Sequence, residues 1–161
     1  MKVKQSIELP AQVSVAEALW YDTSRWPAFV DGLHHVERVE GDWPRLDARV
    51  RWMSTPDGRG LVEERVTHYE VRSGQTIRVE DPRILGTQTV KFTPKPEGAS
   101  ELTIELDFRV KNLNPVAAAL SGFFIRRAMT DMLRRTLGRF KRELRGDLEL
   151  ERESSLSLDG R

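Results

Sequence analysis

The chain has 161 residues, the usual size of one domain, and 39% of them are apolar, which is enough for one hydrophobic core. It carries 26 Lys and Arg against 25 Asp and Glu, so its overall charge does not favour nucleic acid. The absence of cysteine excludes disulfides, thiolate catalysis and cysteine-based metal sites. No apolar run approaches the roughly 20 residues of a membrane helix, and residues 1–10 lack the apolar core of a signal peptide. We therefore expect a cytoplasmic protein.

The first 30 residues predict one strand and two short helices. Polar and apolar residues alternate over 2–9, which indicates a half-buried strand that ends at Pro10. Over 14–20 the spacing becomes helical, with Ser14 as a candidate N-cap and Glu17 three residues later, as in a capping box. Pro27 is suited to a first helical turn, so a second short helix is expected over 27–30.

The middle of the chain predicts an antiparallel meander. Strand patterns separated by short turns rich in Gly, Pro and Asp predict antiparallel pairing of neighbours. Each pattern has one apolar face, so one face of the sheet should be buried. The patterns cover residues 34–40, 47–53, 61–71, 76–80, 84–93 and 101–110.

A long amphipathic helix follows at 115–145, where Asn114 can cap and Pro115 can open it. Its basic pairs recur every seven or eight residues and share an outer face, which favours a solvated surface. Contact with anionic membrane headgroups is the less favoured alternative for this face, and no nucleic-acid partner is expected. Residues 146–161 show no period and are expected to be a polar, disordered tail, so the predicted domain covers 1–145.

This order of elements resembles the helix-grip fold of the Bet v 1-like, START-related (SRPBCC) superfamily, and within it the polyketide cyclase/dehydrase-like branch. The resemblance covers roughly residues 1–145. It implies an α+β fold in which a curved seven-stranded antiparallel sheet wraps a long C-terminal helix and two short helices after the first strand close a cavity. The motifs that carry it are Ala16 to Trp20, Asp22 with Arg25-Trp26-Pro27 and Phe29, Gly58-Arg59-Gly60 with Glu63 to Val66 and Tyr69-Glu70, Gly86 with Thr89 to Phe92, and Asn114-Pro115.

In such proteins the space between sheet and helix holds an apolar ligand, so large apolar side chains on the expected inner faces are candidate ligand contacts. The same residues could simply form the core. The resemblance implies no cofactor and no metal. The candidate ligand-binding residues are Trp26, Phe29, Val50, Trp52, Val62, Val66, Val90, Phe92, Leu106, Phe108, Leu120, Phe123 and Phe124.

Glu64 and His68 are the candidate catalytic residues. Regular alternation places both on the strand face that carries Val62 and Val66, so both would enter the cavity. Burial would raise the pKa of the glutamate and lower that of the histidine, which suits acid/base work. A structural pair, or a strand turned so that its other face points inward, is the alternative. The adjacent His34 and His35 should point to opposite sides of a strand, so we expect them at the rim without a catalytic or zinc-binding role.

These observations leave three functions open. The preferred one is binding or transport of a small hydrophobic molecule, such as a lipid or a polyketide. The first alternative is a cofactor-independent polyketide cyclase or dehydratase that uses acid/base residues of the pocket. The second is a module that binds a protein partner, with a homodimer among the possibilities.

Overall fold

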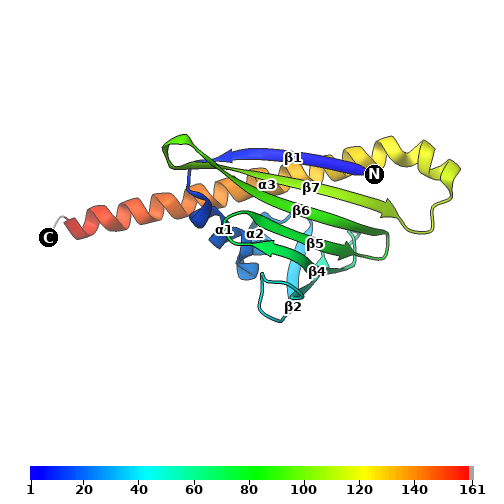
Figure 1. Ribbon diagram of the computed structural model, residues 1–161, viewed down its shortest axis with the longest axis horizontal. Helices are drawn as coiled ribbons and strands as arrows, with labels where there is room; N and C mark the ends of the chain where they lie inside the picture. The colour runs from blue at the N-terminus through cyan, green and yellow to red at the C-terminus, as the bar shows by residue number, and fades with distance from the viewer. Residues whose placement is uncertain (160–161) are drawn as a thin grey trace.

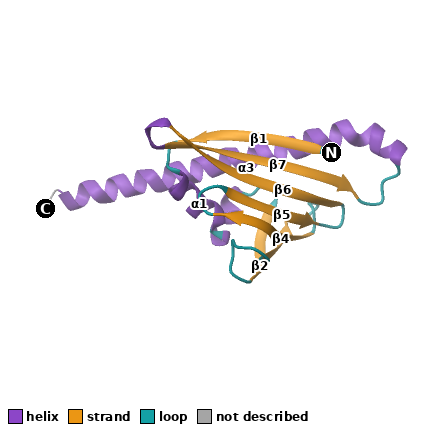
Figure 2. Cartoon of the chain, viewed as in Figure 1, coloured by secondary structure: helices purple, strands orange, loops and turns teal. Residues whose placement is uncertain are grey.

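The computed structural model describes residues 1–159 and has the predicted α+β helix-grip architecture (Figure 1). A seven-stranded antiparallel sheet has the order β1-β7-β6-β5-β4-β3-β2, and the long C-terminal helix α3 crosses one of its faces (Figure 2). The two short helices follow β1 in the chain. The strands are β1 (Lys2–Leu9), β2 (Leu33–Glu40), β3 (Arg49–Ser54), β4 (Leu61–Glu70), β5 (Gly74–Glu80), β6 (Ile84–Lys95) and β7 (Ala99–Val110), and the helices are α1 (Val13–Tyr21), α2 (Trp26–Phe29) and α3 (Pro115–Asp159).

The sheet follows the alternation of the sequence most closely in β6 and β7. These strands pair in unbroken register from Ile84 opposite Val110 to Lys95 opposite Ala99. Their inward side chains, among them Leu106 and Phe108, are buried in the core, as the period of two predicts.

Two strands depart from regular alternation. The register of β4 against β5 shifts between Val66 and His68, and that of β2 against β3 shifts between Leu33 and His35 and again further on. A bulge inserts one extra residue into a strand, so each side chain beyond it changes face relative to regular alternation. Both shifts alter the position of a predicted functional residue.

Helix α1 begins one residue earlier than predicted, and the capping box at Ser14 is wrong. Gln12 occupies the N-cap position and makes no side-chain cap bond. Glu17 is buried and instead accepts hydrogen bonds from the Arg72 backbone N–H (2.9 Å) and from Arg72 Nη1 (2.7 Å). This carboxylate thus joins α1 to the turn between β4 and β5.

Aromatic side chains hold the two short helices against α3. The Phe140 ring on α3 lies 5.1 Å from Phe29 of α2 and 5.4 Å from Trp20 of α1, measured between ring centroids. Trp26 Nε1 donates to the carbonyl oxygen of Trp20 at 2.8 Å. Pro27 lies in the first turn of α2, as predicted. The corner between the helices is therefore part of the core.

Helix α3 is longer than the sequence pattern indicated. It continues through 146–159, so the prediction of a disordered tail is wrong for those residues, and the tail prediction for residues 160–161 lies outside the described residues. The extension is rich in Leu and Glu, which are good helix formers even without a packed face. At 45 residues α3 is about 68 Å long. Both ends of α3 therefore extend beyond the sheet (Figure 1).

Candidate functional site

A small cavity lies between the inner face of the sheet, the segment after α2 and the middle of α3. Its volume is about 50 Å³. That is room for one or two water molecules, whereas ligand sites usually occupy about 300–1,000 Å³. The ligand-sized cavity expected from the fold is therefore not open in this structure, because large side chains fill most of the space. The cavity is lined by Trp20, Trp26, Val30, Asp31, Trp52, Arg59, Glu64, Gln75, Ile77, Gln88, Ile104, Met132, Leu133 and Thr136.

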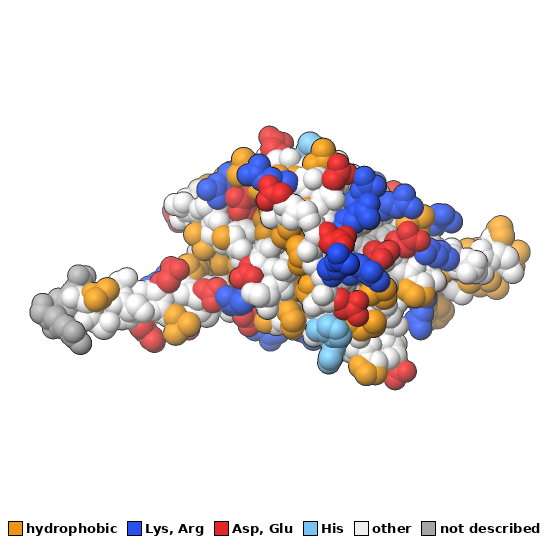
Figure 3. Space-filling view, turned by 90° about the horizontal axis from the view of Figure 1, so that it is seen from below, with side chains coloured by type: hydrophobic (Ala, Val, Ile, Leu, Met, Phe, Trp, Pro, Cys, Tyr) orange, Lys and Arg blue, Asp and Glu red, His pale blue; other side chains and the backbone are white. Residues whose placement is uncertain are grey.

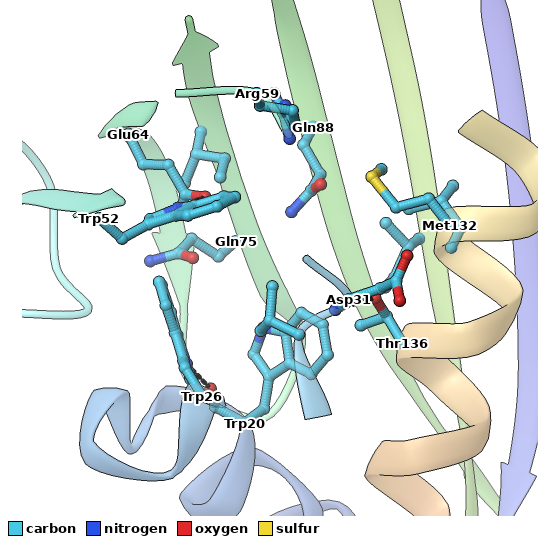
Figure 4. Close-up of a pocket in the computed structure, with 14 residues that line it drawn as sticks. Trp20, Trp26, Asp31, Trp52, Arg59, Glu64, Gln75, Gln88, Met132 and Thr136 are labelled. Carbon is cyan, nitrogen blue, oxygen red and sulfur yellow. Dashed lines mark hydrogen bonds between the residues drawn. The ribbon is translucent and has the colours of Figure 1, made fainter. Parts of the chain in front are cut away.

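The sheet side of the cavity has a polar centre (Figure 4). Trp52 Nε1 on β3 donates to Glu64 Oε1 on β4 at 2.9 Å. The Arg59 guanidinium lies 5.6 Å from the Trp52 ring centroid, a cation–π contact. Arg59 Nε also donates to Asp81 at 2.6 Å, and the side chain of Asp81 is 1% exposed. Two acids, one arginine and one indole thus form a connected group inside the fold.

This polar centre keeps hydrogen-bonding capacity free. Arg59 Nη2 is buried and has no hydrogen-bond partner among the described residues. Gln88 extends into the cavity from β6 (Figure 4). Gln75, in contrast, is occupied, because its amide donates to the Pro44 carbonyl oxygen at 2.8 Å. A buried polar group without a partner is costly, so Arg59 offers a donor to a polar atom that enters the cavity.

Burial raises the pKa of Glu64 above its ordinary value of 4.5. Desolvation of the carboxylate is the main cause, and it outweighs the opposing effects of the Trp52 hydrogen bond and the positive charge of Arg59. A carboxyl group of this kind takes up and releases a proton closer to neutral pH than an exposed one does. Among the lining residues, Glu64 is therefore the carboxyl group best suited to proton transfer, whereas Asp31 is held in ion pairs with Arg135 and Arg139.

The stability of the protein should reveal this raised pKa. A carboxyl group whose folded-state pKa exceeds 4.5 contributes most below the unfolded value, and its contribution is lost as pH rises through the folded value. We therefore expect wild type to lose stability relative to Glu64→Gln in urea denaturation as the pH rises above about 4.5. Glu63→Gln is the matched control, since Glu63 points to solvent and pairs with Arg51. Parallel pH curves for wild type and Glu64→Gln would contradict the raised pKa.

The opposite wall is fixed to α3 through Asp31, which follows α2. The Asp31 backbone N–H donates to Thr136 Oγ1 at 3.0 Å. The Asp31 carboxylate pairs with Arg135 at 2.9 Å and with Arg139 at 3.0 Å. Met132, one turn before Thr136, completes this wall (Figure 4). A single aspartate thus connects the closing segment to three residues of the long helix.

The predicted site residues fall into three groups. Trp26, Trp52 and Glu64 line the cavity. Leu120, Phe123 and Phe124 were expected to face the interior, but they are exposed, because α3 extends beyond the end of the sheet. The remaining candidates are buried in the core without lining the cavity: Phe29, Val50, Val62, Val66, Val90, Phe92, Leu106 and Phe108.

His68 does not join Glu64, and the bulge in β4 is the reason. The register shift after Val66 turns His68 to the exposed outer face. Tyr69 takes the inward position instead and packs against Tyr21, with ring centroids 5.7 Å apart. The expected pair of acid and base is therefore reduced to Glu64.

His34 and His35 are exposed on the edge strand β2, outside the cavity. The prediction that they point apart is wrong, because the irregular register there brings their Nδ1 atoms to 2.8 Å. Within residues 1–159, no group of three or more His, Asp or Glu side chains is placed to hold a metal.

Eleven of the 14 lining residues were not predicted as site residues, and five of these are polar: Asp31, Arg59, Gln75, Gln88 and Thr136. Gln88 could have been found, because it is the one polar residue among the inward positions 84, 86, 88, 90 and 92 of β6. Arg59 belongs to a turn cluster that predicted only a loop. Asp31 and Thr136 meet across 105 positions of the chain, and no local pattern indicates such a contact.

Comparison with known proteins assigns the chain to a protein family. The family model described as polyketide cyclase / dehydrase and lipid transport matches residues 1–145. The chain belongs to this family. A comparison with curated proteins gives no match.

Solved structures of other proteins share the fold of this chain, as the sequence pattern implied. A conserved protein from Geobacillus kaustophilus is 14% identical with a TM-score of 0.73, covering 91% of this chain and 96% of that one. A START superfamily protein from Mycobacterium smegmatis is 12% identical (TM-score 0.72, 90% and 97% covered). Truncated norcoclaurine synthase from Thalictrum flavum is 11% identical (TM-score 0.69, 89% and 92% covered).

Proposed function

We propose that the protein binds a small amphipathic hydrophobic molecule, a lipid or an aromatic polyketide, between the sheet and α3. The observation that carries this proposal is the polar centre of Trp52, Arg59 and Glu64 in a cavity that also has apolar walls, among them Ile104 and Met132. A core that served only stability would gain little from an arginine whose Nη2 is buried without a partner. The family's description, which includes lipid transport, supports the same conclusion.

The ligand's polar end is expected at Arg59. The guanidinium is already paired with Asp81, and the Glu64 carboxyl, bonded to Trp52, lies near enough for the Arg59 charge to act on it. A negatively charged ligand group, such as a carboxylate, would therefore meet one arginine and two acidic side chains. A neutral acceptor, such as a ketone or ester carbonyl, can accept from Nη2 without that repulsion. The apolar body would then lie toward Ile104 and Met132.

Ligand entry requires the closed cavity to widen. Met129 and Met132 lie partly buried on the inner side of α3, and methionine side chains adapt to new shapes at low cost. The contacts of Asp31 with Arg135 and Arg139 are half-exposed ion pairs, which contribute little and break easily. The wall formed by Asp31 and α3 is thus the part of the cavity best suited to open.

A thermal-shift screen tests the proposal. The probes are medium-chain fatty acids, fatty-acid methyl esters and aromatic polyketides. A ligand at a hundredfold excess over its Kd should stabilise the fold by about 2.7 kcal/mol, which raises Tm measurably. The esters and ketones should bind more tightly than the free acids. If no probe in any class shifts Tm, the proposal is wrong.

Catalysis is the second candidate, and the raised pKa of Glu64 favours it. Glu64 would remove a proton next to a ligand carbonyl that Arg59 polarises. Glu64→Gln should then abolish product formation from a poly-β-ketone while ligand-induced stabilisation persists. Equal turnover by wild type and variant would exclude this role.

A further inference from the structure

The N-terminal end of α3 exposes a set of large apolar side chains. The fractional exposures are 70% for Val116, 75% for Leu120, 68% for Phe123 and 71% for Phe124. Figure 3 shows hydrophobic atoms at the tip of this end, where α3 extends beyond the body of the protein. We call residues 115–127 the projecting end. Contiguous exposed apolar side chains of this size mark a surface that binds something.

The projecting end is a capped α-helix with one apolar face. Asn114 Oδ1 accepts from the Ala117 backbone N–H at 2.7 Å, which caps the first turn. Val116, Leu120 and Phe123 follow the three- and four-residue steps that place side chains on one face. Phe124 lies beside them, with its ring centroid 5.6 Å from that of Phe123. The apolar side chains therefore act together as one patch.

Basic residues predominate around the patch, and Asp131, the first acid along α3, is paired with Arg134 at 2.9 Å. Between Asp107 and Asp131 the chain carries four basic residues, Arg109, Lys111, Arg126 and Arg127, and no Asp or Glu. Within residues 1–159, neither Arg126 nor Arg127 forms an ion pair, whereas Lys111 pairs with Glu80 at 2.6 Å. Lys and Arg side chains also gather on the body next to the tip (Figure 3). The surface that covers the patch should therefore be both apolar and anionic.

We propose that the projecting end docks onto the surface of an anionic lipid bilayer. Phe123, Phe124 and Leu120 enter the boundary between headgroups and acyl chains, and Arg126 and Arg127 lie one turn further along at the level of the phosphates. Amphipathic helices bind bilayers in this way, with apolar burial and anionic attraction adding together. Basic side chains extend from the apolar zone to the phosphates. Docking needs no ligand, so it goes beyond the binding function proposed above.

A second copy of the chain is a poorer occupant for the same patch. In a symmetric dimer the same surface of both copies meets, so both copies would bring Arg126 and Arg127 into one interface. No acidic residue of the projecting end is available to compensate for these positive charges. A bilayer containing anionic lipids provides both the apolar layer and the negative charges.

Co-sedimentation with vesicles tests the apolar part of the proposal. The full chain should bind vesicles of phosphatidylcholine mixed with phosphatidylglycerol, and far less to pure phosphatidylcholine. The double variant Phe123→Ser/Phe124→Ser should bind at least about tenfold more weakly. Leu156→Ser/Leu158→Ser is the matched control, because these leucines are equally exposed, at 75% and 76%, at the other end of α3. The proposal is overturned if wild type does not bind the anionic vesicles or if both double variants lose binding equally.

A second pair of variants tests the charges. Arg126→Gln/Arg127→Gln should weaken binding about fivefold for each arginine removed, since one basic residue at an anionic surface contributes roughly 1 kcal/mol. Arg142→Gln/Arg145→Gln, on the same helix but away from the patch, should retain binding. Raising salt from about 0.05 M to about 0.5 M should weaken wild-type binding. A dimer in sedimentation velocity that Phe123→Ser/Phe124→Ser dissociates would overturn the proposal in favour of a second copy.

Discussion

Phe140→Ala should lower the free energy of unfolding by about 3–5 kcal/mol, the range for removing a large aromatic side chain from a core. Phe140 is completely buried and contacts both Phe29 and Trp20. It therefore fixes α3, α1 and α2 to one another at a single point. Domains of this size are stable by about 5–15 kcal/mol, so a substantial part of that stability would be lost.

Urea denaturation followed by far-UV circular dichroism measures this effect, because the signal does not depend on the tryptophan next to Phe140. Phe124→Ala is the matched control on the same helix. Phe124 is 71% exposed, so its removal should change the free energy of unfolding by about 0.5 kcal/mol or less. Equal losses for the two variants would show that α3 is not anchored where the structure places it.

Asp81→Ala should be similarly destabilising, by about 3–5 kcal/mol, because it breaks a buried ion pair from one side. Asp81 accepts from Arg59 Nε and from the backbone N–H groups of Arg83 (2.7 Å) and Ile84 (2.8 Å). All three donors would lose their partner. The Arg59 guanidinium would then lie uncompensated beside the cavity.

The double variant Arg59→Leu/Asp81→Ala separates the ion pair from the rest of this effect. Removing the arginine as well should restore part of the stability, since no buried charge remains unpaired. Asp42→Ala is the control, because Asp42 pairs with Arg45 on the surface, where the expected loss is about 0–1 kcal/mol. If the double variant loses as much free energy of unfolding as Arg59→Leu and Asp81→Ala lose together, Arg59 and Asp81 do not act as a pair.

The sequence predicted the fold well because its signals are local. The alternation of β7, the proline in the first turn of α2 and the Asn114 cap of α3 each depend on residues within a few positions. Together they define the order of the elements. That order is specific enough to indicate the helix-grip fold, which the family and the solved structures confirm.

The site was predicted less well because its geometry is not local. The bulge in β4 moves His68 outward, and the residues around it show no pattern that distinguishes a bulge from a regular strand. In the middle of α3 the apolar stripe is covered: Leu133, Leu137, Phe140 and Leu144 are buried. The same stripe continues through Leu120 and Phe123, beyond the end of the sheet. Periodicity reports an apolar face but not the length over which a partner covers it.

The most direct test of the central claim is whether a molecule occupies the space between Gln88 and α3. Gln88→Phe fills the cavity from the sheet side, whereas Thr87→Phe adds the same ring to the exposed outer face of β6. Native mass spectrometry with the tightest-binding probe from the screen gives the bound fraction for each protein. We expect one ligand per chain for wild type and Thr87→Phe, and loss of at least about 90% of binding for Gln88→Phe. Equal occupancy in all three proteins would place the ligand elsewhere and contradict an interior site.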